Sequence, residues 1–176
     1  MVGELVLIGL GSNLGDSQRI MQTVIPELEQ FSSGGFLASS IWKTSPVDCP
    51  EGSSDYLNAV VRFQSLARVT PEELLEALKQ MEAQWGTRDT DIHNAPRELD
   101  LDLLIFGNGR RETDTFTLPH PRAVERRFVM EPAAQIAPQL PWPGDGRTIA
   151  EINSSLVTDE IVQRLDSYLG PGANMS

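Results

Sequence analysis

Cysteine, basic side chains and long apolar runs are all scarce in this chain of 176 residues. Its one cysteine, Cys49, argues against a disulfide framework or a cysteine-rich zinc module and fits a reducing compartment. Fourteen Lys and Arg stand against 25 Asp and Glu, and this net charge of −11 argues against a general nucleic-acid coat or an anionic-membrane binder. No apolar run approaches the ~20 residues of a membrane span, and the N-terminus lacks the basic start of a signal peptide. We therefore expect a cytoplasmic protein.

The length and composition indicate one compact unit. A chain with 40% hydrophobic and 22% charged residues is an ordinary globular protein, long enough to bury a core without staples. We expect a single domain over residues 1–169. A disordered tail is expected over residues 170–176, which begin with Gly170-Pro171-Gly172. A monomer is the simplest expectation for its assembly.

The spacing of apolar residues and turn formers predicts the order strand, helix, strand, strand, helix, strand. Strands are expected over residues 5–8, 36–44, 56–66 and 99–106, and helices over residues 17–31 and 71–85. Thr70, Pro71 and Glu73 predict the start of the second helix, as cap, first helical residue and capping-box acid. This order favours an α+β fold with a ferredoxin-like βαββαβ core, a largely antiparallel sheet with helices on one face. Extra C-terminal helices are expected around residues 122–135 and 159–168.

Two carboxylates stand out in residues 96–104, which read Pro-Arg-Glu-Leu-Asp-Leu-Asp-Leu-Leu. On a strand, Asp100 and Asp102 point to the same face while the leucines between and beside them point to the core. Adjacent carboxylates repel each other unless a cation lies between them, and Mg²⁺ prefers such oxygen ligands together with substrate phosphates. The alternative is an exposed strand face that happens to carry two aspartates.

Arginines gather around and after this strand. Residues 97–127 hold six of the 14 basic residues and six acids, so this stretch is neutral in an acidic chain. The arginines are Arg97, Arg110, Arg111, Arg122, Arg126 and Arg127. Arginine forks facing Mg²⁺-binding carboxylates are suited to polyphosphate transfer, although any one of them could equally belong to a solvated face. His120, between Pro119 and Pro121, is either a structural histidine or a donor to a phosphate.

The glycines of residues 9–15, Gly-Leu-Gly-Ser-Asn-Leu-Gly, do not form a known nucleotide motif. The last glycine comes one position too late for a dinucleotide fingerprint, and the chain has no phosphate-loop Gly-Lys-Ser/Thr. We interpret these glycines as turn and packing residues.

An ordered set of segments carries a resemblance to a known family. These are residues 8–16 (Ile-Gly-Leu-Gly-Ser-Asn-Leu-Gly-Asp), 56–59 (Tyr-Leu-Asn-Ala), 96–104, 118–122 (Leu-Pro-His-Pro-Arg), 125–129 (Glu-Arg-Arg-Phe-Val) and 135–138 (Gln-Ile-Ala-Pro). In order and spacing the chain resembles the hydroxymethyldihydropterin pyrophosphokinases of folate biosynthesis, from its start to about residue 156.

The resemblance implies transfer of pyrophosphate from ATP to the hydroxymethyl oxygen of 6-hydroxymethyl-7,8-dihydropterin, with release of AMP. It implies that Asp100 and Asp102 hold two Mg²⁺ ions and act in catalysis with Arg97 and His120. The ATP-binding positions it implies are Glu82, Arg88, Arg97, His120 and Arg126. The pterin-binding positions it implies are Thr44, Pro46, Val47, Tyr56, Asn58 and Phe128.

One segment departs from the family pattern. Thr87 and Asp89 stand where the family usually has arginines, Arg88 is the basic residue nearest to them, and Asn94 replaces a common Trp. Residues 87–94 correspond to a loop that normally closes over ATP in the family. The acidic character of this loop here predicts a slower enzyme. Two alternatives stay open at this point: a different two-metal enzyme that needs no pterin pocket, and a non-catalytic relative that binds pterin or a protein.

Overall fold

The computed structural model describes residues 3–13, 16–44, 56–85 and 98–165. Among these residues, six strands form one antiparallel sheet in the order β5-β1-β4-β3-β8, and β2 also pairs with β4. The strands are β1 (Leu5–Ser12), β2 (Ser32–Ala38), β3 (Trp42–Thr44), β4 (Tyr56–Ser65), β5 (Asp100–Phe106) and β8 (Val162–Arg164). A separate small hairpin joins β6 (Arg111–Glu112) to β7 (Thr117–Leu118).

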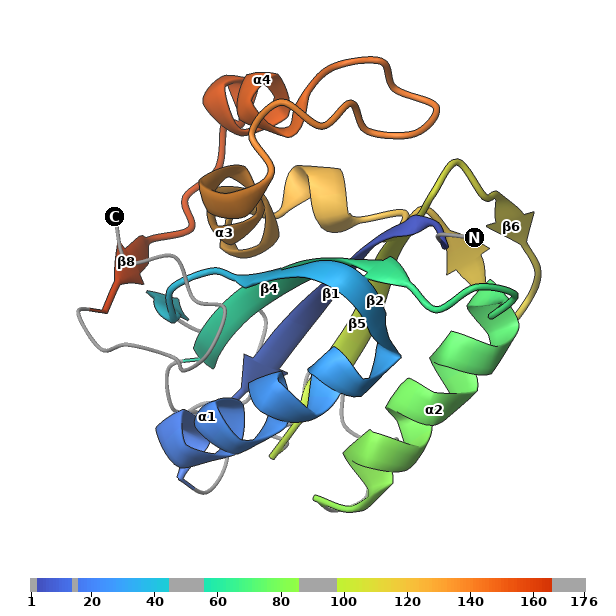
Figure 1. The fold of residues 1–176 in the computed structure, drawn as a ribbon. Coiled ribbons are helices and arrows are strands. Elements are labelled where there is room, and N and C mark those ends of the chain that lie inside the picture. Colours follow the sequence, from blue (N-terminus) through green and yellow to red (C-terminus); the bar gives the residue numbers. More distant parts are fainter. Residues whose placement is uncertain (1–2, 14–15, 45–55, 86–97, 166–176) are drawn as a thin grey trace.

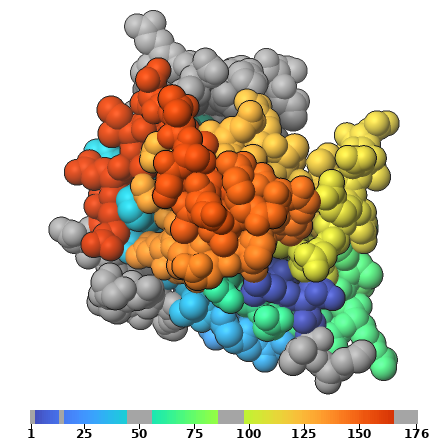
Figure 2. Space-filling view, turned by 90° about the horizontal axis from the view of Figure 1, so that it is seen from above, coloured from blue at the N-terminus to red at the C-terminus, as the bar shows by residue number. Residues whose placement is uncertain are grey.

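Helices lie on both faces of the sheet. The helices are α1 (Ser17–Leu28), α2 (Pro71–Ala83), α3 (Arg127–Ile136) and α4 (Ile149–Ser155), with 3-10 turns η1 (Glu29–Phe31) and η2 (Ala123–Glu125). Figure 1 shows α1 and α2 on one face and α3 and α4 on the other. Seen from above, the residues that follow α3 cover the side of α3 that faces away from the sheet (Figure 2). None of these helices, as far as the chain is described, is both long and apolar enough to cross a membrane.

The predicted βαββαβ core is confirmed. The first strand, β1, lies between β5 and β4, and β2 and β3 lie beyond β4, which is the arrangement expected of a ferredoxin-like sheet. The predicted capping box is also present, because the Thr70 hydroxyl accepts from the Glu73 N–H and the Glu73 carboxylate accepts from the Thr70 N–H. Two helices on one face, with the C-terminal helices added opposite them, complete the fold.

One predicted helix is wrong. Residues 162–164, inside the helix expected over 159–168, form β8 and pair with β3 in an antiparallel register. The Leu165 N–H continues this contact by donating to the Ile41 carbonyl at 2.9 Å. The backbone of β3 has an open side after pairing with β4, and satisfying its polar groups outweighs a weak local helix preference. The tail expected over residues 170–176 lies outside the described residues.

Two predicted segment boundaries also shift. The strand expected over 36–44 is two strands, and the break lies at Ser39. The Ser39 N–H still donates to the Val60 carbonyl, but the Ser39 side-chain hydroxyl, in place of a backbone carbonyl, accepts from the Val60 N–H. Gly9 and Gly11, expected in a turn, lie inside β1. β1 continues through them because it is paired on both sides, and the two neighbouring strands hold its backbone extended.

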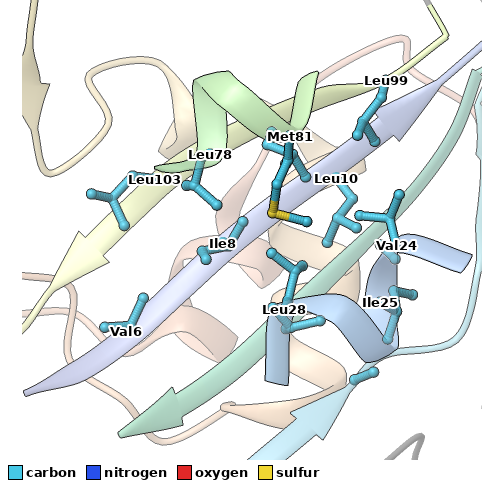
Figure 3. Close-up of a cluster of buried hydrophobic side chains, with 14 of the residues drawn as sticks. Val6, Ile8, Leu10, Val24, Ile25, Leu28, Leu78, Met81, Leu99 and Leu103 are labelled. Carbon is cyan, nitrogen blue, oxygen red and sulfur yellow. The ribbon is translucent and has the colours of Figure 1, made fainter. Parts of the chain in front are cut away.

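The sheet separates two apolar cores. Side chains of Ile8, Leu10 and Leu103 pack with α1 and α2, as the close-up in Figure 3 shows. Leu7, Val60 and Leu104 pack instead with buried residues of α3 and α4. Because side chains alternate along a strand, residues 9 and 11 of β1, 58 of β4, and 100 and 102 of β5 all belong to the face that α3 covers.

Helix α3 is tied to the β2–β3 connection through Gln135. The Gln135 Oε1 atom accepts from the Ser40 N–H at 2.9 Å and from the Trp42 Nε1–H at 3.2 Å, and its Nε2 donates to the Ser40 hydroxyl at 2.8 Å. One residue on, the Ile136 carbonyl accepts from the Arg62 guanidinium of β4 at 3.1 Å. The C-terminal end of α3 is therefore fixed to the sheet by directional contacts as well as by packing.

We expect the substitution Gln135→Met, which keeps the side-chain length, to lower the free energy of unfolding by about 1–3 kcal/mol, because it leaves three polar groups without their partner. Urea unfolding followed by tryptophan fluorescence measures this loss. The matched control is Gln30→Met, an exposed glutamine whose amide donates to the Glu27 carbonyl. A loss no larger than that of the control contradicts the role of Gln135.

Candidate active site

Two glycines open the middle of the sheet face that α3 covers. Gly11 of β1 lies opposite Asn58 of β4 on one side and Asp100 of β5 on the other, and Gly9 lies opposite Val60 and Asp102. A Cβ atom at Gly11 would lie 3.2 Å from the Asn58 Nδ2 atom. The central strand therefore contributes no side chain here, and the Asn58 amide lies beside Gly11, whereas a Cβ atom at Gly9 would meet the Leu104 side chain at 3.5 Å.

Asp100 and Asp102 lie on this face, as their spacing predicts. Both are half-buried, whereas the leucines at 99, 101 and 103 are buried in the core under α1 and α2. The part of the chain that the structure describes holds no cluster of three or more His, Cys, Asp or Glu side chains able to bind a metal. The donor set is thus a pair of hard carboxylates at positions i and i+2 of one strand.

Glu82, in the last turn of α2, contacts the backbone between these two aspartates. Its Oε2 atom accepts from the Leu101 N–H at 2.7 Å. This N–H belongs to β5, which ends the strand order on that side of the sheet. Glu82 therefore holds the strand segment that carries Asp100 and Asp102, a contact that the sequence did not reveal because its partner is a backbone group.

A polar pair of side chains lies across Gly11 from Asp100. The Asn58 side chain is buried, and its Oδ1 atom accepts from the Thr44 hydroxyl at 2.8 Å. Thr44 pairs with Tyr56 in the β3–β4 register, so Thr44, Tyr56 and Asn58 are neighbours. The contact with Thr44 fixes the Asn58 amide and leaves its Nδ2 donors beside Gly11.

His120 is fixed by two backbone contacts. Its N–H donates to the Leu104 carbonyl at 2.9 Å, and its Nδ1 atom accepts from the Arg122 N–H at 3.3 Å, so Nε2 carries the ring proton. Burial lowers the pKa of His120 from 6.5 to about 4. The positive charges of Arg126 and Arg122 act in the same direction, and the negative charge of Asp100 opposes them. His120 is therefore a neutral donor at neutral pH, close enough to Asp100 and Arg126 to feel both charges.

Arg126 and Phe128 stand together at the start of α3. The Arg126 guanidinium lies over the Phe128 ring, 5.4 Å from its centre, in a cation–π contact. Both side chains are half-buried. This places a planar cation and an aromatic ring at the start of the helix that packs on the sheet face to which the aspartates and Asn58 belong.

Other arginines of the 97–127 stretch serve structural contacts. Arg111 forms an ion pair with Glu72, and its Nη2 atom donates to the Glu72 Oε1 at 3.2 Å. Arg127 donates to the Leu156 carbonyl at 3.1 Å. The alternative of a solvated or structural arginine thus applies to Arg111 and Arg127.

Several predicted residues lie outside the described residues. These are Pro46, Val47, Arg88, Arg97 and the whole loop 87–94. The two segments that contain them join described elements at this site: residues 45–55 connect Thr44 to Tyr56, and residues 86–97 connect α2 to β5.

The site contains a feature that sequence reasoning missed. Gly9 and Gly11 are part of the site face, not of a turn. The signal was their spacing: two glycines at alternate positions of a strand remove side chains from one face only.

Comparison with known proteins identifies a family. The family model described as 7,8-dihydro-6-hydroxymethylpterin-pyrophosphokinase matches residues 7–138. The 2-amino-4-hydroxy-6-hydroxymethyldihydropteridine pyrophosphokinase of Bacillus subtilis is 35% identical over 140 residues, which cover 79% of this chain and 81% of the relative. The protein of the same name from Pseudomonas aeruginosa is 32% identical over 150 residues, covering 85% of this chain and 90% of the relative.

Solved structures share the fold. The structure of wild-type Plasmodium falciparum HPPK-DHPS with SDX-DHP superposes with a TM-score of 0.66 at 11% identity. The match covers 88% of this chain and 44% of that chain, so the chain spans less than half of the solved protein. With a family model matched over residues 7–138 and relatives matched over most of both chains, the chain belongs to the 7,8-dihydro-6-hydroxymethylpterin-pyrophosphokinase family, a family of transferases in folate biosynthesis.

Proposed function

We propose that this chain transfers the pyrophosphoryl group of ATP to the hydroxymethyl oxygen of 6-hydroxymethyl-7,8-dihydropterin and releases AMP. The observation that carries the proposal is the placement of the Asn58–Thr44 pair and of Asp100 on one sheet face, with Gly11 between them. The strands that carry Asn58 and Asp100 are two strand spacings apart, about 10 Å. A flat two-ring substrate can lie across Gly11 with its polar edge at Asn58 and its hydroxymethyl group toward Asp100.

The proposed pterin pocket consists of an amide and aromatic rings. Asn58 suits the pterin edge because an amide both donates and accepts, and Thr44 keeps its orientation fixed. Tyr56 and Phe128 would enclose the flat ring, one from the sheet and one from α3. Pro46 and Val47, in the connection between Thr44 and Tyr56, would complete the pocket.

The proposed nucleotide site lies on the other side of Gly11. Arg126 and the Nε2–H of His120 would donate to phosphate oxygens of ATP, together with Arg97 and Arg88. A neutral His120 adds a directional donor, whereas the two arginines supply charge. Glu82 would act near the nucleotide by holding the backbone of β5 at Leu101.

Asp100 and Asp102 would hold Mg²⁺, and the family resemblance favours two ions. The pair fits this metal because Mg²⁺ takes hard oxygen ligands, uses one or two carboxylates and shares its remaining positions with water and phosphates. When bound, Mg²⁺ neutralises the charge of the triphosphate and so favours attack at phosphorus.

The chain's own residues would position the two reactants for an in-line transfer. The hydroxymethyl oxygen forms a bond to the β-phosphorus, the bond from that phosphorus to the α–β bridging oxygen breaks, and the hydroxyl proton is released. Arginines stabilise the charge that develops on the bridging oxygen, and the pocket fixes the attack angle. No covalent intermediate with the protein is required.

The atypical residues 87–94 would slow this reaction. In the sequence, Thr87 and Asp89 stand where arginines would attract ATP, so closure of the loop over the nucleotide would be weakened. We further propose that the chain acts in the cytoplasm as a monomer, in keeping with its single cysteine.

Incubation of the purified protein with Mg²⁺, ATP and 6-hydroxymethyl-7,8-dihydropterin is expected to yield AMP, and only when both metal and pterin are present. Asp100→Asn and Asp102→Asn should each lower kcat by at least about 10²-fold, because they remove charge that stabilises the transition state. The control is Asp114→Asn, an exposed aspartate in the small hairpin. ADP in place of AMP would indicate ordinary kinase chemistry, and binding of both substrates without AMP would favour a non-catalytic relative.

Gly11→Ala is expected to raise the KM for the pterin about fivefold with a smaller change in kcat. The added Cβ would lie 3.2 Å from the Asn58 Nδ2 atom, so the amide must move away from its position by a few tenths of an ångström, which costs about one hydrogen bond. Steady-state kinetics at saturating ATP measure the effect. Gly34→Ala is the matched control, because a Cβ at Gly34 in β2 meets no atom within 4 Å. Equal KM values for the two variants would remove Asn58 from the pterin site.

The His120 ring is expected to titrate near pH 4 in the free protein, below its ordinary value of 6.5. As the pH falls from about 7 to 4, His120 of the unfolded chain binds a proton that folded His120 excludes, so stability is lost over this window. His120→Gln lacks this loss, and its stability relative to the parent chain should rise as the pH falls. Heteronuclear NMR of the ring, assigned by its absence in His120→Gln, gives the midpoint. A midpoint near 6.5 contradicts the neutral-donor role.

A further inference from the structure

A short segment after α4, outside the residues 7–138 that the family model matches, contacts the start of α3. We call residues 156–160, Leu-Val-Thr-Asp-Glu, the anchor segment. In Figure 1 the chain passes from α4 alongside α3 before it reaches β8. The anchor segment therefore touches the helix whose first residues, Arg126 and Phe128, belong to the candidate active site.

The anchor segment supplies the cap that α3 lacks in its own sequence. The N-cap residue of α3, Arg126, forms no side-chain capping bond. Instead, the Glu160 Oε2 atom accepts from the Arg127 N–H at 3.1 Å, across 33 residues of sequence. The first N–H groups of a helix have no partner inside the helix, and a carboxylate there also has a favourable interaction with the helix dipole.

Neighbouring contacts fix the Glu160 carboxylate and Arg127. The Thr158 hydroxyl donates to the same Glu160 Oε2 atom at 2.9 Å and accepts from the Glu160 N–H at 3.2 Å. The Arg127 guanidinium donates to the Leu156 carbonyl at 3.1 Å. Arg127 is thus held by its backbone through Glu160 and by its side chain through Leu156.

We propose that Glu160 is a positioning residue for the substrates, because it fixes the turn of α3 from which Arg126 and Phe128 project. The inference rests on the proposed function, since it assigns Arg126 to the ATP phosphates and Phe128 to the pterin. Glu160 itself touches neither substrate. It acts through residue 127, which lies between the two side chains that form the cation–π contact.

The geometry also specifies a rescue variant. Glu160 is half-buried, and its Oε1 atom is buried without a hydrogen-bond partner in the described part of the chain. Glutamine keeps an oxygen that can accept from the Arg127 N–H and from the Thr158 hydroxyl, and its NH₂ group takes the place of the unpartnered oxygen. Glu160→Gln therefore preserves the cap, whereas Glu160→Ala removes it.

The test measures KM values for ATP and for the pterin, and hydrogen exchange of the first turn of α3, in the full-length chain. Glu160→Ala should raise both KM values about fivefold, the effect of one lost hydrogen bond, and speed exchange at residues 127–130. Glu160→Gln should stay within about twofold of the parent chain, and Thr158→Val, which removes only the hydroxyl that orients the carboxylate, should fall between them.

The matched control is Glu73→Ala, which removes the carboxylate that accepts from the Thr70 N–H at the start of α2. If Glu73→Ala and Glu160→Ala lose similar stability and both KM values stay unchanged in Glu160→Ala, the role of Glu160 is only structural and the inference is overturned. If Glu160→Ala does not fold, unchanged KM values for ATP and the pterin in Thr158→Val overturn the inference instead.

The proposed function can fail separately. If the parent chain forms no AMP, the inference is decided by equilibrium binding of ATP and by exchange. Weaker ATP binding with faster exchange at residues 127–130 in Glu160→Ala, but not in Glu160→Gln, supports a positioning role. Unchanged ATP binding overturns it.

Discussion

The absence of side chains at Gly9 and Gly11, on one face of the central strand, is the constraint on which the rest of the site depends. β1 pairs on both sides, so its backbone is fixed by β4 and β5, and Gly9 and Gly11 leave the middle of the α3 face without a Cβ atom. The neighbouring strands then bring Asn58 and Asp100 to either side of Gly11, and the Leu104 side chain lies over Gly9. A residue with a side chain at position 11 would separate the same polar groups by apolar bulk.

The two faces of the sheet have different roles in the protein. The face under α1 and α2 is mainly apolar, with Ser12 and Ser65 at strand ends, and contains the larger group of buried side chains. The face under α3 is apolar only in part. It carries Leu7, Val60 and Leu104 along part of the strands and polar residues such as Asp100 and Asp102 at one end. Burial of the first core stabilises the fold, and this offsets the cost of the buried or half-buried polar groups on the second face.

Most of the core could be predicted from the sequence because its signals are local. Asp100 and Asp102 alternate with leucines, so the period of two assigns them to one face, and Thr70 with Glu73 marks a helix start within four residues. β8 and the contacts of Gln135 could not be predicted, since their partners are backbone groups or distant side chains. The same reason hides Glu160, whose partner is the backbone of a residue 33 positions away.

Glu82 and β8 have a further consequence at the two edges of the sheet. Edge strands with unpaired N–H and C=O groups are templates for pairing with other chains, which leads to aggregation. At β5, Glu82 takes up the Leu101 N–H, and at β3 the strand β8 covers the open side with only three residues of its own. These contacts thus shorten the open edge at β5 and cover that of β3, whereas β2 pairs with β4 alone among the described strands.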